Sequence, residues 1–387
     1  MLAVCLRVTV GVAAATVAVI TVRSALRTMV VPRGVPDRLT RVVFRVMDSV
    51  AGWRSRRARS YRQLDRRTAG LGLGLLFVLL ATWLTGIWLA GAGIQWALTQ
   101  GPATQVFAGS AAALTTIGAP PGGDAAAAAG DVEAVLGLGL LALVIGYLPS
   151  LYAAFSRREA LITKLAMRTG LPPAGPAILT RLWRSAGPQD LLDGTWRDWE
   201  NWFADVSESH TTFPSLAFFR SPQTAKSWIT SAGAVLDAAA LALAVTDADP
   251  GPAPRMCLHA GITALRHIAD FHGIGYDLDP APAPAPITIQ RHEMLAACQA
   301  MAAVGVPVVG DLDAAYDRFC GRRLAYDRLL LALCAYIYAP YAPWSSDRVT
   351  GPRHRPPILR VGAGSTGRVH SRLRPETGST RQNKTAS

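Results

Sequence analysis

Three long apolar runs constrain the fold of this chain more than any other feature of its sequence. They cover residues 8–22, 70–98 and 132–155, and the first extends back to Leu2 if Arg7 turns its charge toward the membrane surface. A helix needs about 20 mainly apolar residues to cross a bilayer. We therefore expect a mainly α, integral membrane protein with about three transmembrane helices. Only 17% of the residues are charged, whereas soluble domains usually carry about 25%.

Arginine is distributed unevenly around these runs. The net charge is +13, and basic residues crowd residues 23–67 and the part of the chain after residue 156, whereas residues 99–131 contain neither lysine nor arginine. Positive residues favour the cytoplasmic side of a membrane. We therefore expect a multi-pass protein with its N-terminus outside and its large C-terminal region in the cytoplasm. Because the basic runs flank apolar helices, we assign them to membrane lipid and expect no binding of nucleic acid.

Changes in composition along the chain predict how it divides into domains. The segment after the first run is basic and amphipathic, and such helices lie on anionic membrane surfaces. After residue 345 the hydrophobic periodicity ends, which is typical of a disordered tail. The predicted parts are an N-terminal transmembrane anchor (1–23), a basic cytoplasmic amphipathic segment (24–69), a span–pore loop–span module (70–155), a cytoplasmic helical domain (156–345) and a disordered basic tail (346–387).

The loop between the second and third runs is too long for a turn and too poor in charge for an exposed domain. Residues 103–115 have the length of a short helix, and Thr115, Thr116, Ile117 and Gly118 stand at its C-terminal end. Non-helical backbone at membrane depth is tolerated where it lines a polar pathway or is buried in protein, and its carbonyl oxygens can replace the hydration shell of a cation. The loop is therefore either a re-entrant, pore-like element for a monovalent cation or a small-residue linker between two spans.

The loop also resembles the pore module of the potassium-channel superfamily. Thr116, Ile117 and Gly118 match the first three positions of its filter pattern T-x-G-Y/F-G. Ala119 then takes the place of the aromatic residue that braces the filter, and Pro120 takes the place of the second glycine. Proline cannot reach the positive φ that this glycine supplies, so the chain departs from the pattern that confers potassium selectivity.

Further stretches are similar to one bacterial family. They are "YLPSLYAAFSRRE" at 147–159, "ESHTTFP" at 208–214 and "FRSP" at 219–222. The chain resembles bacterial potassium-channel-like membrane proteins, which have a single pore-loop module and an uncharacterised cytoplasmic helical region. The resemblance implies a bacterial cell membrane location and cation conduction through an oligomeric pore. Because one pore loop cannot enclose an axis, it also implies a homo-oligomer of four chains.

Gly146 and Pro149 lie in the inner part of the third run. A proline inside a helix removes a backbone hydrogen bond and bends the helix. In a pore-lining helix such a bend is a natural hinge. The alternative is a bend that only helps the helix to pack.

Aromatic residues indicate the core of the cytoplasmic domain. Trp196, Trp199 and Trp202 recur every three residues, which is the spacing of one buried helix face. Residues 227–245 are almost wholly apolar, and their length is borderline for a span. We expect a buried core helix there, because a single extra span would place the basic tail outside, and we expect the tryptophans to pack against it.

The same domain contains a cluster of titratable residues. Asp205, Glu208 and His210 are close in sequence, and Arg220 follows shortly after, so they form a candidate cytoplasmic ligand or charge-pair site; the alternative is an ordinary capped helix end. Their spacing is not that of a metal site, and the chain has no nucleophile or nucleotide motif. We therefore expect no catalytic residues, no metal and no cofactor. The rival to a channel is a non-conducting, membrane-anchored ligand-binding or scaffold protein.

Overall fold

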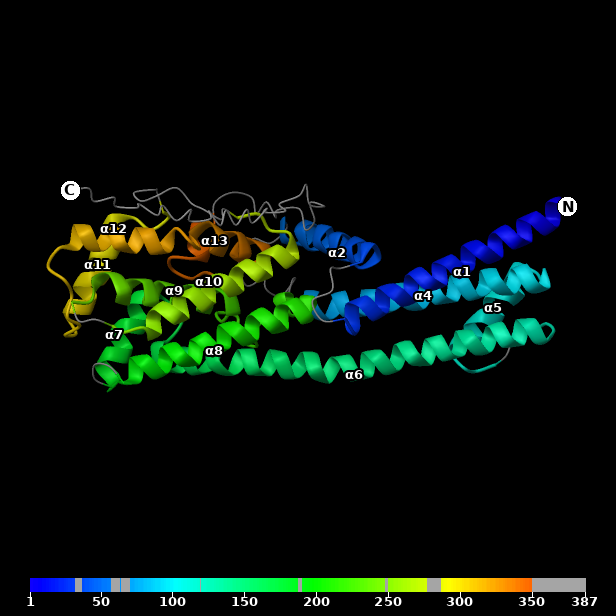
Figure 1. Cartoon of the computed structure of the whole chain (residues 1–387), viewed down its shortest axis with the longest axis horizontal. Coiled ribbons are helices and arrows are strands. Elements are labelled where there is room, and N and C mark those ends of the chain that lie inside the picture. Colours follow the sequence, from blue (N-terminus) through cyan, green and yellow to red (C-terminus); the bar gives the residue numbers. More distant parts are fainter. Residues whose placement is uncertain are drawn as a thin grey trace, which may run out of the picture.

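The computed structural model describes residues 1–31, 37–56, 63, 70–118, 120–186, 190–247, 250–276 and 287–349. Within these ranges the protein is mainly helical and contains no β-strand, only a single antiparallel bridge between Thr246 and Val308. Figure 1 shows an elongated molecule in which three long helices project from a compact group of shorter ones. The predicted mainly α class is therefore confirmed.

The three long helices are α1 (Leu2–Met29), α4 (Leu71–Thr99) and α6 (Asp124–Thr169). Each is long and apolar enough to cross a membrane, and each exposes many large apolar side chains, as in a multi-pass membrane protein. Helices α1 and α4 pack through small residues. A Cβ on Gly93 would lie 2.8 Å from the Cβ of Ala14, and one on Gly86 would lie 2.6 Å from Oγ1 of Thr21, so glycine lets the two backbones approach closely.

Helix α6 is longer than the sequence suggested, because it begins at Asp124 rather than near residue 132. Its first turns are an alanine run, and alanine has the highest helix propensity. The helix has 46 residues and is therefore about 70 Å long. It passes through Gly146 and Pro149 without interruption and ends at Thr169 inside the compact group of shorter helices.

Helix α2 (Arg38–Arg56) lies beside the first part of α4 (Figure 1). The sequence predicted one apolar face, but the apolar side chains divide between two. Val43 and Phe44 are buried, and the Phe44 ring centroid is 6.4 Å from that of Phe218. Four others, Val42, Val46, Val50 and Trp53, are exposed. Residues 57–62 and 64–69 of the predicted basic segment lie outside the described residues.

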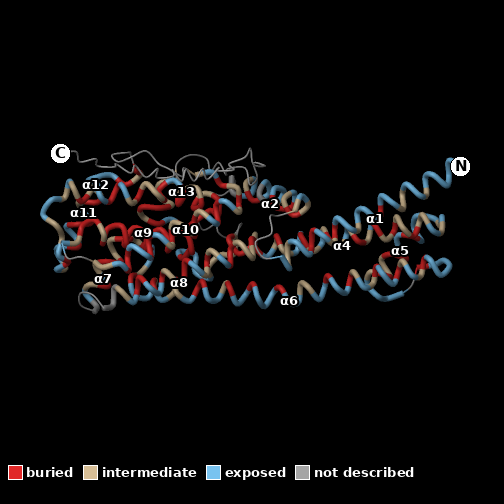
Figure 2. The backbone as a smooth tube through the Cα atoms, viewed as in Figure 1, coloured by how far each residue is buried: buried red, intermediate tan, exposed pale blue. Residues whose placement is uncertain are grey.

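The compact group contains the remaining helices around a central one, α9 (Trp228–Val245). Every residue of α9 except Leu243 is buried, as Figure 2 shows in red. By length and composition α9 is a fourth candidate span, but its neighbours enclose it, which confirms the expected core helix. These neighbours are α7 (Gly175–Ala186), α8 (Asp190–Thr212), α10 (Ala253–His272), α11 (Arg291–Ala302), α12 (Leu312–Arg323) and α13 (Asp327–Tyr336), with short 3-10 helices at Pro214–Phe218 and Ser346–Arg348.

The tryptophans of α8 are buried, as predicted. Trp196 and Trp199 are each 1% exposed and Trp202 is 4% exposed. Their packing partner is partly different from the prediction, because α10 lies between much of α8 and α9. At Gly261 of α10, a Cβ would lie 2.5 Å from Leu236 of α9 and 2.8 Å from Phe203 of α8, so this glycine brings the three helices together.

Asp237, the one charged residue of α9, is paired inside the core. Arg323 of α12 donates to its Oδ1, and the hydroxyl of Tyr326 donates to the same oxygen at 2.8 Å. Arg323 also donates to Asp327 at 2.7 Å and to the carbonyl oxygen of Trp344 at 2.6 Å. A buried charge is tolerated only when it is paired in this way, so the cluster joins α9, α12 and α13 to the C-terminal end of the described chain.

The folded chain extends slightly beyond the predicted boundary at residue 345. Arg348 donates to Glu293 of α11, and Trp344 is buried. Residues 350–387 of the predicted disordered tail lie outside the described residues, as do residues 277–286.

Candidate functional site

Helix α5 (Ala103–Leu114) turns back from the end of α4 and lies between α4 and α6 (Figure 1). Trp88 of α4 holds its first turns. The Trp88 indole N–H donates to the carbonyl oxygen of Phe107 at 3.0 Å, and the two rings meet edge to face. Trp88 lies eleven residues before Thr99, the last residue of α4, which corresponds to about 16 Å. Helix α5 therefore returns along α4, and it contacts α4 well before the C-terminal end of that helix.

The predicted filter-like residues form the cap of α5 rather than an extended strand. The N–H groups of Thr116 and Ile117 donate to the carbonyl oxygens of Ala113 and Ala112, both at 2.9 Å. This is the hydrogen-bond pattern of a Schellman cap. Thr116 takes the position that glycine usually occupies there, with a φ of 60°, which is strained for a β-branched residue. All four predicted residues are exposed, and Ile117 is 85% exposed.

Pro120 packs the returning chain against two helices. A Cβ on Gly130 of α6 would lie 2.5 Å from its Cδ, and one on Gly109 of α5 would lie 3.2 Å from its Cα. The proline therefore fits between two glycines, which explains its presence at the position where a potassium filter has glycine. Ala119 lies outside the described residues.

Behind this turn lies a buried polar cluster that the sequence analysis missed. Glu133 of α6 is 4% exposed, and its carboxyl group meets Ser110 of α5 and Gln95 of α4, which are 0% and 2% exposed. Ser110 Oγ is 2.5 Å from Glu133 Oε1, and Gln95 Nε2 donates to Oε2 at 3.2 Å. The signal was present in the sequence, because an ionisable residue inside an apolar span usually marks a functional position.

A second buried cluster surrounds Arg158, where α6 enters the compact group around α9. The side chain is 0% exposed. Its guanidinium donates to Glu159 Oε1 at 2.9 and 3.1 Å, and to the carbonyl oxygens of Leu216 at 2.9 Å and Phe219 at 2.8 Å. Burial lowers the pKa of Arg158, and the Glu159 carboxylate opposes this shift. The cluster joins the three stretches that carry the family resemblance.

His210 of α8 completes this cluster as a neutral ring. Its Nδ1 is 3.0 Å from the carbonyl oxygen of Val206, which can only accept, so Nδ1 carries the proton. Nε2 then accepts from Arg158 Nη1 at 3.2 Å. Burial, and after it the positive charge of Arg158, lower the pKa of His210 well below its usual range. The ring also contacts Trp228 of α9, with centroids 4.7 Å apart.

The structure does not bring the four predicted cytoplasmic residues into one site. Asp205 pairs with Arg157 at 3.3 Å on the surface. Arg220 donates to the carbonyl oxygens of Ile337 and Tyr338. Glu208 and His210 lie on opposite faces of α8, because two residues of helix correspond to a rotation of about 200°.

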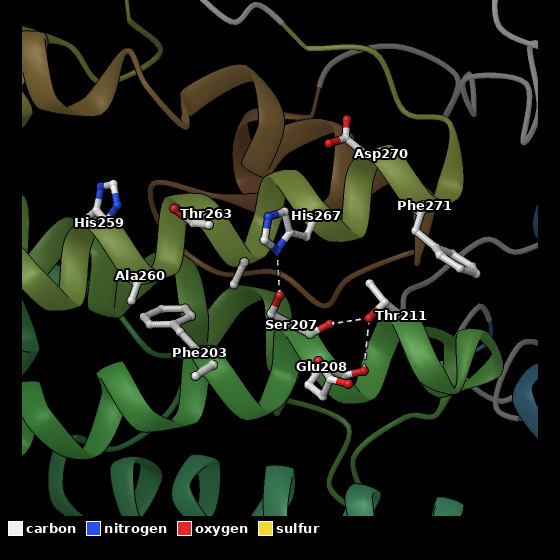
Figure 3. Close-up of a pocket in the computed structure, with 12 residues that line it drawn as sticks. Phe203, Ser207, Glu208, Thr211, His259, Ala260, Thr263, His267, Asp270 and Phe271 are labelled. Atoms are coloured by element: carbon white, nitrogen blue, oxygen red, sulfur yellow. Dashed lines mark hydrogen bonds between the residues drawn. The ribbon is translucent and has the colours of Figure 1, made fainter. Parts of the chain in front are cut away.

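Glu208 instead lines a surface groove between α8 and α10 with a volume of about 690 Å³. Figure 3 shows His267 of α10 pointing toward Ser207 of α8, with Nδ1 and Oγ 3.0 Å apart. Thr211 and Asp270 also line the groove. Within the described ranges, no three His, Cys, Asp or Glu side chains are placed to hold a metal ion.

Comparisons with known proteins add nothing to this geometry: no family model, no curated protein and no solved structure matches the chain. A functional assignment therefore depends on the arrangement of α4, α5 and α6 and on the two buried clusters of α6. The first cluster fixes α5 between α4 and α6, and the second fixes α6 in the compact group around α9.

Proposed function

We propose that this chain is a subunit of an ion channel of the potassium-channel-like type in a bacterial cell membrane. Monovalent cations would pass along the axis of a homo-oligomer of four subunits, because a single pore loop per chain cannot enclose an axis. The N-terminus would lie outside, and the helical domain would lie in the cytoplasm. Helices α1, α4 and α6 would span the membrane, and α9 would remain in the core of the domain.

The observation that carries this proposal is the exposed turn at Thr115–Gly118. It follows a short helix that descends between two spans, and its side chains are exposed in the single chain. Non-helical backbone at that depth requires a polar pathway or a protein neighbour, and an oligomeric axis supplies both. The N–H groups of Thr116, Ile117 and Gly118 cap α5, so the turn offers oxygens and the negative end of the α5 dipole to a cation.

The capped turn favours cation conduction over strict potassium selectivity. A potassium filter coordinates ions with successive carbonyl oxygens of an extended strand. Here three successive N–H groups fold back onto the helix, and a proline packed between Gly109 and Gly130 follows. We therefore propose a monovalent cation pathway without assigning the ion that it prefers.

Cation flux through reconstituted full-length protein tests this proposal. We would place a cysteine at Ile117 in a background in which the exposed Cys5 is replaced by serine, since the other four cysteines are buried. A charged thiol reagent should block the flux through Ile117→Cys. The matched control is Val12→Cys, which is 62% exposed on α1 and away from α5, and its flux should not change. Absence of flux from folded oligomers, or equal effects on both variants, would contradict the proposal.

One observation favours a second function, the binding of a ligand in the cytoplasm. The groove between α8 and α10 has the volume of a small-molecule site and brings Ser207 and His267 within hydrogen-bond distance. In a non-conducting protein this groove would be the functional part. Flux that is absent from folded oligomers, together with ligand binding that Ser207→Ala removes, would support this rival.

A further inference from the structure

Two close contacts of Ser110 bear on the protonation state of Glu133. Ser110 Oγ lies 2.9 Å from the carbonyl oxygen of Trp88 and 2.5 Å from Glu133 Oε1. A hydroxyl group has one proton to donate, and the carbonyl oxygen of Trp88 can only accept. If Ser110 donates to Trp88, a second proton is needed between Ser110 and Glu133, and a protonated carboxyl group supplies it.

The other partners of the carboxyl group agree with a neutral acid. Gln95 Nε2 donates to Oε2, which is the contact expected of the carbonyl oxygen of an acid whose proton is on Oε1. The resulting chain runs from Glu133 to Ser110 to the Trp88 carbonyl oxygen: Glu133 and Ser110 each donate once, and the carbonyl oxygen accepts. The contact of 2.5 Å is also at the short end of O–H···O distances.

Among the described residues, the helices packed against Glu133 place no positive charge beside it that would stabilise a carboxylate. Helices α4 and α5, which pack against Glu133, contain no Asp, Glu, Lys, Arg or His. On α6 itself the neighbouring acids are Asp124 and Asp131, both exposed, and α1 carries Arg7, which donates to the carbonyl oxygens of Ala97 and Leu98. An unpaired carboxylate buried at membrane depth would cost several kcal/mol.

We propose that Glu133 is a proton-binding site and that its bound proton holds the re-entrant helix α5 between α4 and α6. The carboxyl group packs directly against α4 at Gly91. A Cβ at this position would clash with Glu133 Oε2. Loss of the proton places a negative charge against Ser110 and the α4 backbone, which the helices relieve by separating. Alkaline pH therefore loosens α5, and neutral pH fixes it.

The effect of this proton on conduction depends on the proposed function, since α5 carries the turn at Thr115–Gly118. The protonation of Glu133 itself does not depend on the proposed channel function. A non-conducting protein with the same three helices would hold the same proton. The experiment below therefore measures the carboxyl group directly, so that the failure of one proposal leaves the other testable.

Infrared spectroscopy of the full-length protein in lipid vesicles detects protonated carboxyl groups by their C=O band. At neutral pH the wild-type protein should show a band of one protonated carboxyl group per chain that Glu133→Gln lacks. Raising the pH should abolish this band in the wild type. The matched control is Asp131→Asn, two residues away and exposed, which should leave the band unchanged.

Two further measurements keep the result decisive. Ser110→Ala removes the acceptor of the proton and should shift the band without removing it, which tests the assignment even if Glu133→Gln does not fold. Glutamine can donate to Ser110 and accept from Gln95, so it mimics the neutral acid. Hydrogen exchange of the α5 amides, corrected for the intrinsic rate, should therefore increase at alkaline pH in the wild type and not in Glu133→Gln. Identical neutral-pH spectra of wild type and Glu133→Gln, or a band unmoved by Ser110→Ala, would overturn the proposal.

Discussion

Replacement of Arg158 by methionine tests the cluster that joins α6 to the compact helical group around α9. Methionine retains much of the length of the side chain and removes its charge and its donors. The replacement leaves Glu159 and the carbonyl oxygens of Leu216 and Phe219 without the donor that they share in the wild type. We expect a large loss of stability, because all of these groups remain in the protein interior.

The magnitude follows from the number of groups that lose their donor. Removal of one partner of a buried ion pair costs about 3–5 kcal/mol, and each buried acceptor left unsatisfied costs about 1–3 kcal/mol. These costs overlap, because the structure relaxes and water enters. We therefore expect the free energy of unfolding to fall by about 3–5 kcal/mol.

The neighbouring residue provides the control. Arg157 pairs with Asp205 at 3.3 Å, and its side chain is 60% exposed. Surface ion pairs contribute about 0–1 kcal/mol, so Arg157→Met should have little effect. Both variants remove one arginine from the same turn of α6, and they therefore change the net charge and the helix propensity equally.

Denaturant unfolding in detergent micelles, followed by tryptophan fluorescence, measures the difference between the two variants. The addition of Glu159→Gln to Arg158→Met should recover about 1–2 kcal/mol, because the amide can donate to one of the unpaired oxygens. Exposed positions usually change the free energy of unfolding by less than about 1 kcal/mol. If the free energies of unfolding of Arg158→Met and Arg157→Met differ by less than this, Arg158 is not the buried residue that joins α6 to its neighbours.

Three further outcomes follow from burial, titration and charge. Trp199→Ala should cost about 3–5 kcal/mol, as for a buried aromatic residue, and Trp53→Ala, 56% exposed, should cost less than about 1 kcal/mol; equal costs would contradict the assigned core. Burial lowers the pKa of His272 to about 4 from 6.5, so between these values the unfolded chain binds a proton that the native chain does not. Stability should therefore fall as the pH falls through this window, by up to about 3 kcal/mol from this residue, and His272→Asn should reduce the slope of unfolding free energy against pH. A cysteine placed at Asp124 should be labelled from outside the cell, and one placed at Ser365 should be labelled only after permeabilisation. The reverse pattern would contradict the proposed orientation, with the N-terminus outside and the C-terminal region in the cytoplasm.

The sequence predicted the helices best where apolar and polar residues contrast. The runs at 70–98 and 227–245 became α4 and α9 nearly unchanged, because length and composition determine such elements. The start of α6 at Asp124 was not predicted, because an alanine run has no polar face to set a period. The sequence also did not distinguish the buried face of α2 from its exposed face, because valine occurs on both faces.

The candidate sites were harder to predict, because they depend on which way a side chain faces. Arg157 and Arg158 are adjacent and identical in type, and they differ by a rotation of about 100° on α6. Only the position of α8 and of the chain near Phe219 decides which one is buried. His210 presented the same difficulty, because its partner Arg158 lies 52 residues away in sequence. Glu133, in contrast, was predictable from the rule that a carboxyl group in an apolar span is rarely incidental.

The two buried clusters act on one continuous element. Glu133 and Arg158 both belong to α6 and are 25 residues apart, or about 38 Å along the helix axis. The first fixes α6 to α5 and α4, and the second fixes it to α8 and to the chain around Leu216 and Phe219. A rigid helix would transmit any displacement of the compact helical group around α9 directly to α5. Pro149 lies between the two clusters, where it removes a backbone hydrogen bond, and a Cβ at Gly146 would meet nothing within 4 Å. Pro149 is nine residues before Arg158, so the hinge that the sequence predicts at Gly146 and Pro149 would lie between the two clusters. A bend of α6 there would reduce the part of a domain movement that reaches α5.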